Sequence, residues 1–385
     1  MRLTVVGGGV IGLLTAVEGV LAGHRVTVLD AGELPTQTAA SFDRHRIMRA
    51  LHPKDSAATG AGVRAHHRWL ELERLLFARF YDRVGALTVL PDDELADGVS
   101  ALWNCQTQAQ VLRPDQLASR YPHLIFPAQR SAVFESDAGV LLADRVLAAC
   151  VAWLRGQPHV RLLPHTEVIR VNGETATVIT THGAEMVADA VVVAMGPRSR
   201  RLLPVDIASG LTLYRQSMIY CQVPSDLDAW ASTPAIPSLG TSTGSWLVPP
   251  VAGTPLKLSS HSACRVVDSV TDNATSKYWR KRLVDEFRRW IPHFSADWVM
   301  DSRDCYYLTD TLTTAPVVAS LGERVVSYAA CGGGSFKFAP LIAQALLRRA
   351  IGLPYAPVGL AALDRQPLSL DRQFARDVGS AVRSS

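Results

Sequence analysis

Three glycines near the start of the chain, Gly7, Gly9 and Gly12, have the spacing G-x-G-x-x-G. Glycines in this pattern allow a tight turn, the approach of a pyrophosphate to the backbone, and close packing of a helix on a strand. The N–H groups at the start of that helix would then face the phosphates. Asp30 follows at about the distance expected for an acid that binds a ribose hydroxyl. These residues predict a dinucleotide site, and the motif alone leaves FAD and NAD(P) both open.

Basic residues that could bind a carboxylate or stabilise a developing negative charge occur at three further places. The stretch Arg44–Arg49 holds three arginines and a histidine, Lys257 lies in the largely apolar run 255–259, and Lys337 lies between two phenylalanines just after a glycine turn. An arginine fork binds a carboxylate through two hydrogen bonds, and a lysine adds a point charge. The structural alternatives are a surface ion pair for Arg49 and solvated charges for the two lysines. The apolar surroundings of Lys337 favour a functional role.

The elements that must position these residues begin as strand, glycine turn, helix and strand. The glycine motif lies between a predicted strand at 3–6 and a predicted helix at 13–22, and a second strand at 25–29 ends at Asp30. The continuous apolar run at 190–197 predicts a buried parallel strand whose end lies near the dinucleotide. The N-terminal part of the chain is therefore expected to be a Rossmann-like α/β domain.

Later segments follow two different patterns. A strand at 324–330 runs into the glycine turn 331–335 and then into a helix at 339–351, which repeats the arrangement at the N-terminus. Apolar residues at helical spacing predict a long amphipathic helix over 63–81. The segment 211–301 alternates short strands with Pro and Gly breaks, which predicts a second domain rich in β-strands.

Composition excludes several classes of protein. A chain of 385 residues with 48% hydrophobic residues suggests two domains. The net charge of +4 is mild and the basic residues are scattered, so we expect no nucleic-acid partner. Glycines and Glu18 interrupt the apolar N-terminal run, which argues against a secretory signal or a membrane span. The six cysteines lack C-x-x-C spacing, so we expect no metal site, no disulfide scaffold and a cytoplasmic location.

Several local blocks, in the same order along nearly the whole chain, carry a family resemblance. The chain resembles the FAD-dependent amine oxidases of the D-amino-acid oxidase superfamily, and within it most closely the branch of monomeric sarcosine oxidase and N-methyltryptophan oxidase, with glycine oxidase as a further relative. The blocks are Gly7–Gly12, Arg46-Ile47-Met48-Arg49, Leu256-Lys257-Leu258 with His261, Cys305-Tyr306-Tyr307 and Gly334-Ser335-Phe336-Lys337-Phe338.

The resemblance implies roles for the residues that match the family's substrate site. Arg49 and Lys337 would hold the substrate carboxylate over the flavin, and Lys257 would lie beside the flavin and assist oxygen reduction. A cation there stabilises the negative charge that develops on oxygen. His261 and Tyr307 match active-site residues, although a lone histidine is more often a structural residue.

Two departures from the family pattern bear on the substrate. Trp246 stands where sarcosine oxidase has an active-site tyrosine, and Cys331-Gly332-Gly333-Gly334-Ser335 replaces a bulkier turn. A wider or more apolar pocket would follow. We therefore expect a substrate larger than sarcosine, either an N-substituted glycine with a long substituent or a cyclic amino acid.

The cofactor implied by the resemblance is FAD. Cys305 aligns with the cysteine that forms a thioether to the isoalloxazine 8-methyl group, although Leu308-Thr309-Asp310-Thr311 replaces the family's Thr-Pro-Asp after this block. The alternative is a buried, inert cysteine. Arg46 is expected to contact either the flavin ring or a structural carboxylate. The full set of expected cofactor-binding residues is Gly7, Gly9, Gly12, Asp30, Arg46, Val168, Gly196, Cys305, Gly333, Gly334 and Lys337.

The implied fold is a Rossmann-like FAD-binding domain with a second antiparallel-sheet domain for substrate, and the chain crosses between them more than once. The expected FAD-binding domain comprises 1–80, 139–205 and 300–360, the substrate domain comprises 81–138 and 206–299, and 361–385 form a C-terminal tail.

The implied reaction is oxidation of a secondary amine or amino acid that carries a carboxylate. Hydride transfer to flavin N5 gives an imine, and O2 is reduced to hydrogen peroxide. We expect a monomer or weak oligomer. Two alternatives stay open: a flavin dehydrogenase that passes electrons to another acceptor, and a non-catalytic dinucleotide-binding module.

Overall fold

The computed structural model describes residues 1–224, 228–355 and 358–360, and all structural statements below refer to these residues. Contacts divide the chain into two compact units. The first unit comprises Met1–Phe42, Leu147–Leu213 and the residues from Tyr307 onward, and the second comprises Asp43–Val146 and Tyr214–Tyr306. The expected C-terminal tail, 361–385, lies outside the described residues.

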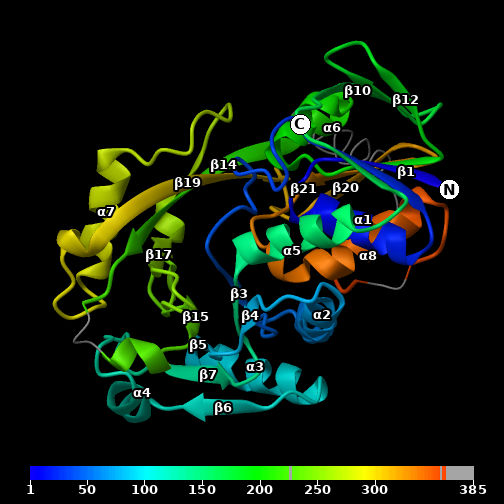
Figure 1. Ribbon diagram of the computed structural model, residues 1–385. Coiled ribbons are helices and arrows are strands. Elements are labelled where there is room, and N and C mark those ends of the chain that lie inside the picture. Colours follow the sequence, from blue (N-terminus) through cyan, green and yellow to red (C-terminus); the bar gives the residue numbers. More distant parts are fainter. Residues whose placement is uncertain (225–227, 356–357, 361–385) are drawn as a thin grey trace, which may run out of the picture. The chain divides into compact units, whose positions relative to one another are not determined.

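The first unit is built on a six-stranded sheet (Figure 1). Its parallel strands come from widely separated parts of the sequence, and only β20 runs antiparallel to its neighbour. The strands are, in spatial order, β20 (Val317–Gly322), β21 (Val325–Ala330), β13 (Ala190–Val193), β1 (Arg2–Val6), β2 (Arg25–Leu29) and β9 (Val160–Leu163).

Two different layers cover this sheet. On one face α1 (Val10–Leu21) packs against α8 (Ala339–Ala350), as Figure 1 shows. On the other face lies a three-stranded antiparallel sheet of β10 (Val168–Asn172), β11 (Thr177–Thr180) and β12 (Glu185–Val187). Valines of the two sheets share one apolar cluster, so burial of apolar surface holds these layers together.

The parallel register places the residues that follow β1, β2 and β13 at the same edge of the sheet. Val6 of β1 lies beside Val193 of β13 and Leu29 of β2, so the glycine turn after β1 and the residues after β2 and β13 meet at the carboxyl edge of the sheet. From β1 the chain continues to β2 on one side, whereas the later strands β13 and β21 lie on the other side, so the strand order reverses at β1. Dinucleotides bind at such a switch point. The predicted Rossmann-like domain is confirmed.

The second unit contains a nine-stranded, mostly antiparallel sheet. β15 and β5 are its exception, because they pair in parallel. The strands along its path are β18 (Cys264–Val266), β14 (Leu211–Cys221), β17 (Leu256–Ser260), β16 (Ser245–Val248), β15 (Ala235–Ser238), β5 (Ala86–Leu90), β7 (Ser131–Glu135) and β6 (Ala109–Leu112), and β19 (Val299–Asp310) pairs with β14.

A small antiparallel sheet in the same unit positions the basic stretch. In it β8 (Gly139–Leu141) pairs with both β3 (Arg46–Met48) and β4 (Tyr81–Asp82). The remaining helices of the chain include α2 (Ser56–Leu75), α3 (Asp92–Asn104), α4 (Pro114–Arg120), α5 (Ala143–Arg155), α6 (Val205–Ser209) and α7 (Lys277–Phe287).

The units differ from the expected domain boundaries. Residues 43–80 and 139–146 lie in the second unit, whereas the sequence placed them in the FAD-binding domain. The physical reason is the pairing of β3 and β4 with β8, which ties both stretches to the second unit. Residues 206–213 lie in the first unit and 300–306 in the second, opposite to the expectation. The long strands β14 and β19 each contain residues of both units. The functional assignment of the two units stays a prediction.

The helix predicted over 63–81 is shifted. α2 begins at Ser56 and ends at Leu75. Asp55 is its N-cap, because the Asp55 side chain accepts a hydrogen bond from Ala58 N. Phe77 has a positive φ of 49°, which stops the helix, and Tyr81 already belongs to β4.

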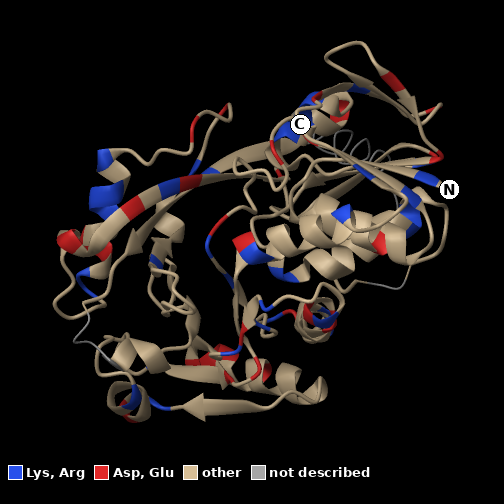
Figure 2. Ribbon diagram, viewed as in Figure 1, with Lys and Arg blue, Asp and Glu red and all other residues tan. Residues whose placement is uncertain are grey.

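Charged residues of both signs are interspersed along many elements of the described chain, as Figure 2 shows. Among the described residues, no helix combines the length and the apolar character needed to cross a membrane.

Candidate functional site

The glycines of the first unit each meet a different steric demand. Gly7 has φ +112°, a conformation that favours glycine, and it ends β1 at the turn. A Cβ on Gly12 would overlap the carbonyl oxygen of Gly7, so α1 could not lie this close to the turn with any other residue there. Gly9 is the N-cap of α1, and a Cβ there would meet only Ser41 Oγ, at 3.3 Å. The turn and helix packing require Gly7 and Gly12, whereas Gly9 leaves space beside the helix N-terminus.

The surroundings of this turn suit an anion. No acidic residue lies in the first turn of α1, so the positive end of the helix dipole is not neutralised there. Asp30 lies at the end of β2, where its carboxylate accepts hydrogen bonds from Gly8 N (2.7 Å) and Gly32 N (2.8 Å). Asp30 therefore shapes the turn and stands at the same sheet edge as the glycines.

The other expected cofactor residues of the first unit fall into two groups. Gly196 follows β13 with φ +58°, and a Cβ there would meet no described atom within 4 Å. A Cβ on Gly333, φ +73°, would meet the Tyr307 ring at 2.9 Å, so the turn after β21 lies against this ring. Val168 is different, because its side chain is buried in the apolar cluster between the two sheets and only its main chain could face a ligand.

Lys337 lies beside this glycine turn, in the 3-10 helix Ser335–Phe338. Its Nζ donates to the carbonyl oxygen of Gly334 at 3.2 Å and lies 4.8 Å from the Phe338 ring centroid. The side chain is half-buried. The first unit thus brings Lys337, Gly334, Gly333 and Tyr307 together at the carboxyl end of β21.

In the second unit, a buried carboxylate joins Lys257 and Arg46. Asp43 contacts both cations through Oδ2, and its Oδ1 accepts a hydrogen bond from Tyr220 OH at 2.7 Å. Tyr220 of β14 and Lys257 of β17 are directly paired across the sheet. Lys257 and Asp43 are 2% and 5% exposed. The sequence alone assigned no role to Asp43.

Burial decides the protonation tendencies of this cluster. It lowers the pKa of Lys257 well below the usual range, and the nearby Arg46 guanidinium lowers it further, while contact with a carboxylate favours the ammonium form. Burial also raises the pKa of Tyr220 to about 12, so its hydroxyl remains a donor. His45 is fully buried, and desolvation followed by the Lys257 charge lowers its pKa to about 3. His45 is therefore a neutral imidazole at ordinary pH.

Arg49 follows β3 and lies near a second buried carboxylate, Glu135. The Nη1 atom of Arg49 is buried and has no hydrogen-bond partner among the described residues. Glu135 accepts from Ala50 N (2.8 Å) and Leu51 N (3.1 Å) through one oxygen, while its other oxygen has no partner in the described part of the chain. Burial lowers the pKa of Arg49 and raises that of Glu135, and each charge opposes the shift of the other. A buried guanidinium with an unused N–H can bind a further acceptor.

Trp246 lies in β16, which pairs with the strand that contains Lys257, and His261 follows that strand directly. The Trp246 ring centroid is 5.5 Å from Lys257 Nζ, so the lysine has an aromatic neighbour as well as a carboxylate. His261 is exposed, begins a 3-10 helix after β17, and has its ring packed over Gly244. The structure therefore brings Trp246 to Lys257 and places His261 at the surface of the unit.

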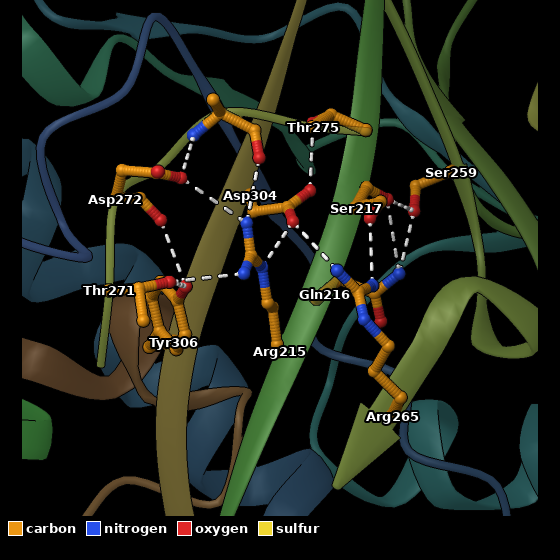
Figure 3. Close-up of polar contacts among 11 residues, drawn as sticks. Arg215, Gln216, Ser217, Ser259, Arg265, Thr271, Asp272, Thr275, Asp304 and Tyr306 are labelled. Carbon is orange, nitrogen blue, oxygen red and sulfur yellow. Dashed lines mark hydrogen bonds and ion pairs between the residues drawn. The ribbon is translucent and has the colours of Figure 1, made fainter. Parts of the chain in front are cut away.

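Cys305 lies on β19, where successive side chains point to opposite faces. Its neighbours Asp304 and Tyr306 are buried, whereas Cys305 is half-buried. Figure 3 shows Asp304 between Arg215 and Arg265; Asp304 Oδ2 accepts from Arg265 Nη2 at 2.8 Å, and Oδ1 accepts from Thr275 Oγ1 at 2.7 Å. These contacts fix the position of β19 and with it the face that carries Cys305.

The comparisons with known proteins agree with this arrangement. The DAO family, described as FAD dependent oxidoreductase, matches residues 2–349. Monomeric sarcosine oxidase from Bacillus sp. (strain B-0618) is 24% identical over 280 residues, 70% of each chain, and the enzyme of that name from Arthrobacter sp. (strain TE1826) is 23% identical over 278 residues, again 70% of each.

Solved structures show the same fold at lower identity. NikD, an amino acid oxidase essential for nikkomycin biosynthesis, has a TM-score of 0.77 with 19% identity and covers 94% of this chain and 97% of its own. A modified fructosyl peptide oxidase from Aspergillus nidulans has a TM-score of 0.78 with 19% identity and covers 96% and 94%.

The chain belongs to the DAO family of FAD-dependent oxidoreductases. The geometry fits its cofactor, since the turn at Gly7, the space beside Gly9 and the acid-free start of α1 lie together at the carboxyl edge of a parallel sheet. Among the described residues, no group of three or more His, Cys, Asp or Glu side chains could hold a metal ion.

Proposed function

We propose that this protein is an FAD-dependent oxidase of a secondary amine or amino acid that carries a carboxylate. The observation that carries the proposal is the buried Nη1 atom of the Arg49 guanidinium, which has no acceptor in the described part of the chain. A buried cationic donor left without an acceptor is costly, and a substrate carboxylate would supply the missing hydrogen bond. Names of the relatives, sarcosine oxidase and NikD among them, support an amino-acid-like substrate.

In this proposal the chain binds and orients, and the cofactor carries the redox chemistry. The chemistry that FAD would supply when bound is hydride removal from the carbon next to nitrogen and two-electron reduction of O2 to hydrogen peroxide. Arg49 holds the substrate carboxylate, and Lys337 is the expected second cation. Lys257 supplies a buried positive charge where oxygen becomes negative. Neutral His45 and the Tyr220 hydroxyl add no further charge to the surroundings of Lys257.

The substrate is proposed to be larger than sarcosine. Trp246 presents an apolar ring beside Lys257, and the glycine turn 332–334 has no side chains of its own. Both features suit an N-substituted glycine with a long substituent or a cyclic amino acid. A cytoplasmic location and a monomeric or weakly associated state also stay predictions.

The proposed function is tested by mixing the purified yellow protein anaerobically with N-substituted glycines and cyclic amino acids. We expect at least one of them to bleach the visible absorbance of the flavin. On admission of air, hydrogen peroxide should form in a 1:1 ratio with oxygen consumed. Bleaching without oxygen consumption would instead identify a dehydrogenase. Failure of every carboxylate-bearing amine to bleach the flavin would reject the proposal.

Arg49 gives the matched test of substrate binding. Replacement Arg49→Gln removes the guanidinium, and since a hydrogen bond to a charged group contributes about 1.5–3 kcal/mol, the anaerobic substrate Kd should rise roughly 10- to 150-fold. Arg44→Gln is the control, because Arg44 belongs to the same basic stretch but is exposed. An unchanged Kd in Arg49→Gln would remove this residue from the substrate site.

A further inference from the structure

The carboxylate of Asp43 is the centre of the charged cluster in the second unit. Through Oδ2 it contacts Lys257 and Arg46, and through Oδ1 it accepts hydrogen bonds from Tyr220 OH and Arg44 N, both at 2.7 Å. Every contact comes from a group that donates a hydrogen bond or carries positive charge. Such a set holds a carboxylate ionised in a buried position.

The backbone at Asp43 and Arg44 is hydrogen-bonded to the start of α5. Its carbonyl oxygen accepts from Asp144 N at 2.9 Å, and that of Arg44 accepts from Ala143 N at 3.1 Å. This pairing leads directly into β3, which pairs with β8. The carboxylate therefore stands on a fixed strand entry, so it can fix the position of Lys257 Nζ, which also reaches the carbonyl oxygen of His45 at 3.4 Å.

The other charged and titratable groups near Lys257 mostly act against its positive charge. Arg46 and Arg303 both disfavour the ammonium form, and Cys305 acts in the opposite direction only if it is ionised. Arginine cannot give up its proton under ordinary conditions, whereas lysine readily does so when buried. Without Asp43, the least costly way to reduce this buried positive charge would be loss of the proton from Lys257.

We propose that Asp43 is a positioning residue that keeps Lys257 in its ammonium form and holds its Nζ in one place. The inference rests on the proposed function only for its consequence, which is that Asp43 maintains the charge assigned to oxygen reduction. Control of the Lys257 charge and position by Asp43 does not depend on which reaction the protein catalyses.

The lysine content of the chain makes a direct measurement practical. The sequence holds five lysines, Lys54, Lys257, Lys277, Lys281 and Lys337. Lysine labelled with 13C at Cε gives one resonance for each, whose chemical shift reports protonation of the neighbouring Nζ. The signal of Lys257 in the holoenzyme is identified by its loss in Lys257→Met.

The test is a pH titration of the labelled holoenzyme and its variants. Loss of an opposite charge at this distance lowers a lysine pKa by about 1–3 units, so the Lys257 midpoint should fall by that amount in both Asp43→Asn and Asp43→Ser. Asp43→Glu, which keeps the charge, should restore most of the wild-type midpoint. Asp285→Asn is the matched control, since it removes the exposed partner of Lys281 and should leave the Lys257 signal unchanged. A Lys257 midpoint equal to that of the wild type in Asp43→Asn or Asp43→Ser would overturn the proposal.

Reoxidation of the reduced holoenzyme by O2 separates this inference from the proposed function. We expect Asp43→Asn to slow reoxidation at pH values above its lowered Lys257 midpoint, and to have no further effect once Lys257 is replaced by Met. If the Lys257 midpoint falls while reoxidation is unchanged, control of Lys257 by Asp43 is supported and the oxygen role of Lys257 is rejected.

Discussion

At the scale of single residues, burial decides which charged side chains can act. Lys257 is buried beside Asp43 and the Nη1 atom of Arg49 is buried near Glu135, whereas Arg44 from the same basic stretch faces solvent. Buried ionic groups are expensive unless paired, so their presence in these positions needs a reason beyond stability. Lysine is rare in this chain, with five among 39 basic residues, and two of the five stand at proposed functional positions.

Cys305 carries the residue-scale prediction. If Cys305 bonds covalently to the flavin, the yellow colour of wild-type protein will stay with the acid-precipitated pellet, and Cys305→Ala will release it into the supernatant. Cys264→Ala is the control, because Cys264 is also half-buried and lies in the same unit. Release of the colour from wild-type protein would show that the flavin is not covalently bound.

At the scale of elements, the turn between β1 and α1 shows how one motif combines two demands. Gly7 and Gly12 are required by the fold itself, since one has a positive φ and the other faces the carbonyl oxygen of the first. Gly9 is required only if a ligand approaches, because a Cβ there meets no backbone atom of the described chain within 4 Å. The same motif therefore contains structural and ligand-binding glycines.

These different demands predict different outcomes for two substitutions. Gly12→Ala should lower the urea midpoint of unfolding even without flavin, because α1 must move away from the turn. Gly9→Ala should leave the flavin-free urea midpoint within experimental error of the unsubstituted protein and weaken FAD binding. Both are measured in the Cys305→Ala background, so that flavin can be removed and its Kd determined by fluorescence quenching. Equal FAD affinity in Gly9→Ala and its parent would contradict a close approach of the cofactor there.

At the scale of the whole molecule, each functional part is assembled from distant stretches of sequence. The carboxyl edge of the first unit combines the ends of β1, β2, β13 and β21. The cluster around Lys257 combines a strand entry at Asp43 with β14 and β17. The family match likewise extends over residues 2–349 and not over one short motif.

Much of the molecule follows from local sequence. The first thirty residues specify strand, turn, helix and strand because their glycine spacing and apolar pattern allow little else, and β1, α1 and β2 agree with that prediction. The apolar run that became β13 and the turn before α8 were also predictable, since a buried parallel strand and a glycine turn have strong local signatures.

Tertiary structure alone decided the rest. Asp43 looked like an ordinary loop residue, because its partners Lys257 and Tyr220 are about two hundred positions away and no local pattern records such a pairing. The same reason explains the domain boundaries, since β8 draws β3 and β4 into the second unit. Sequence by itself determined the family chemistry and the cofactor motif, which depend on residue type and short spacing. The fold determined which charges meet, because that depends on strand pairing between distant segments.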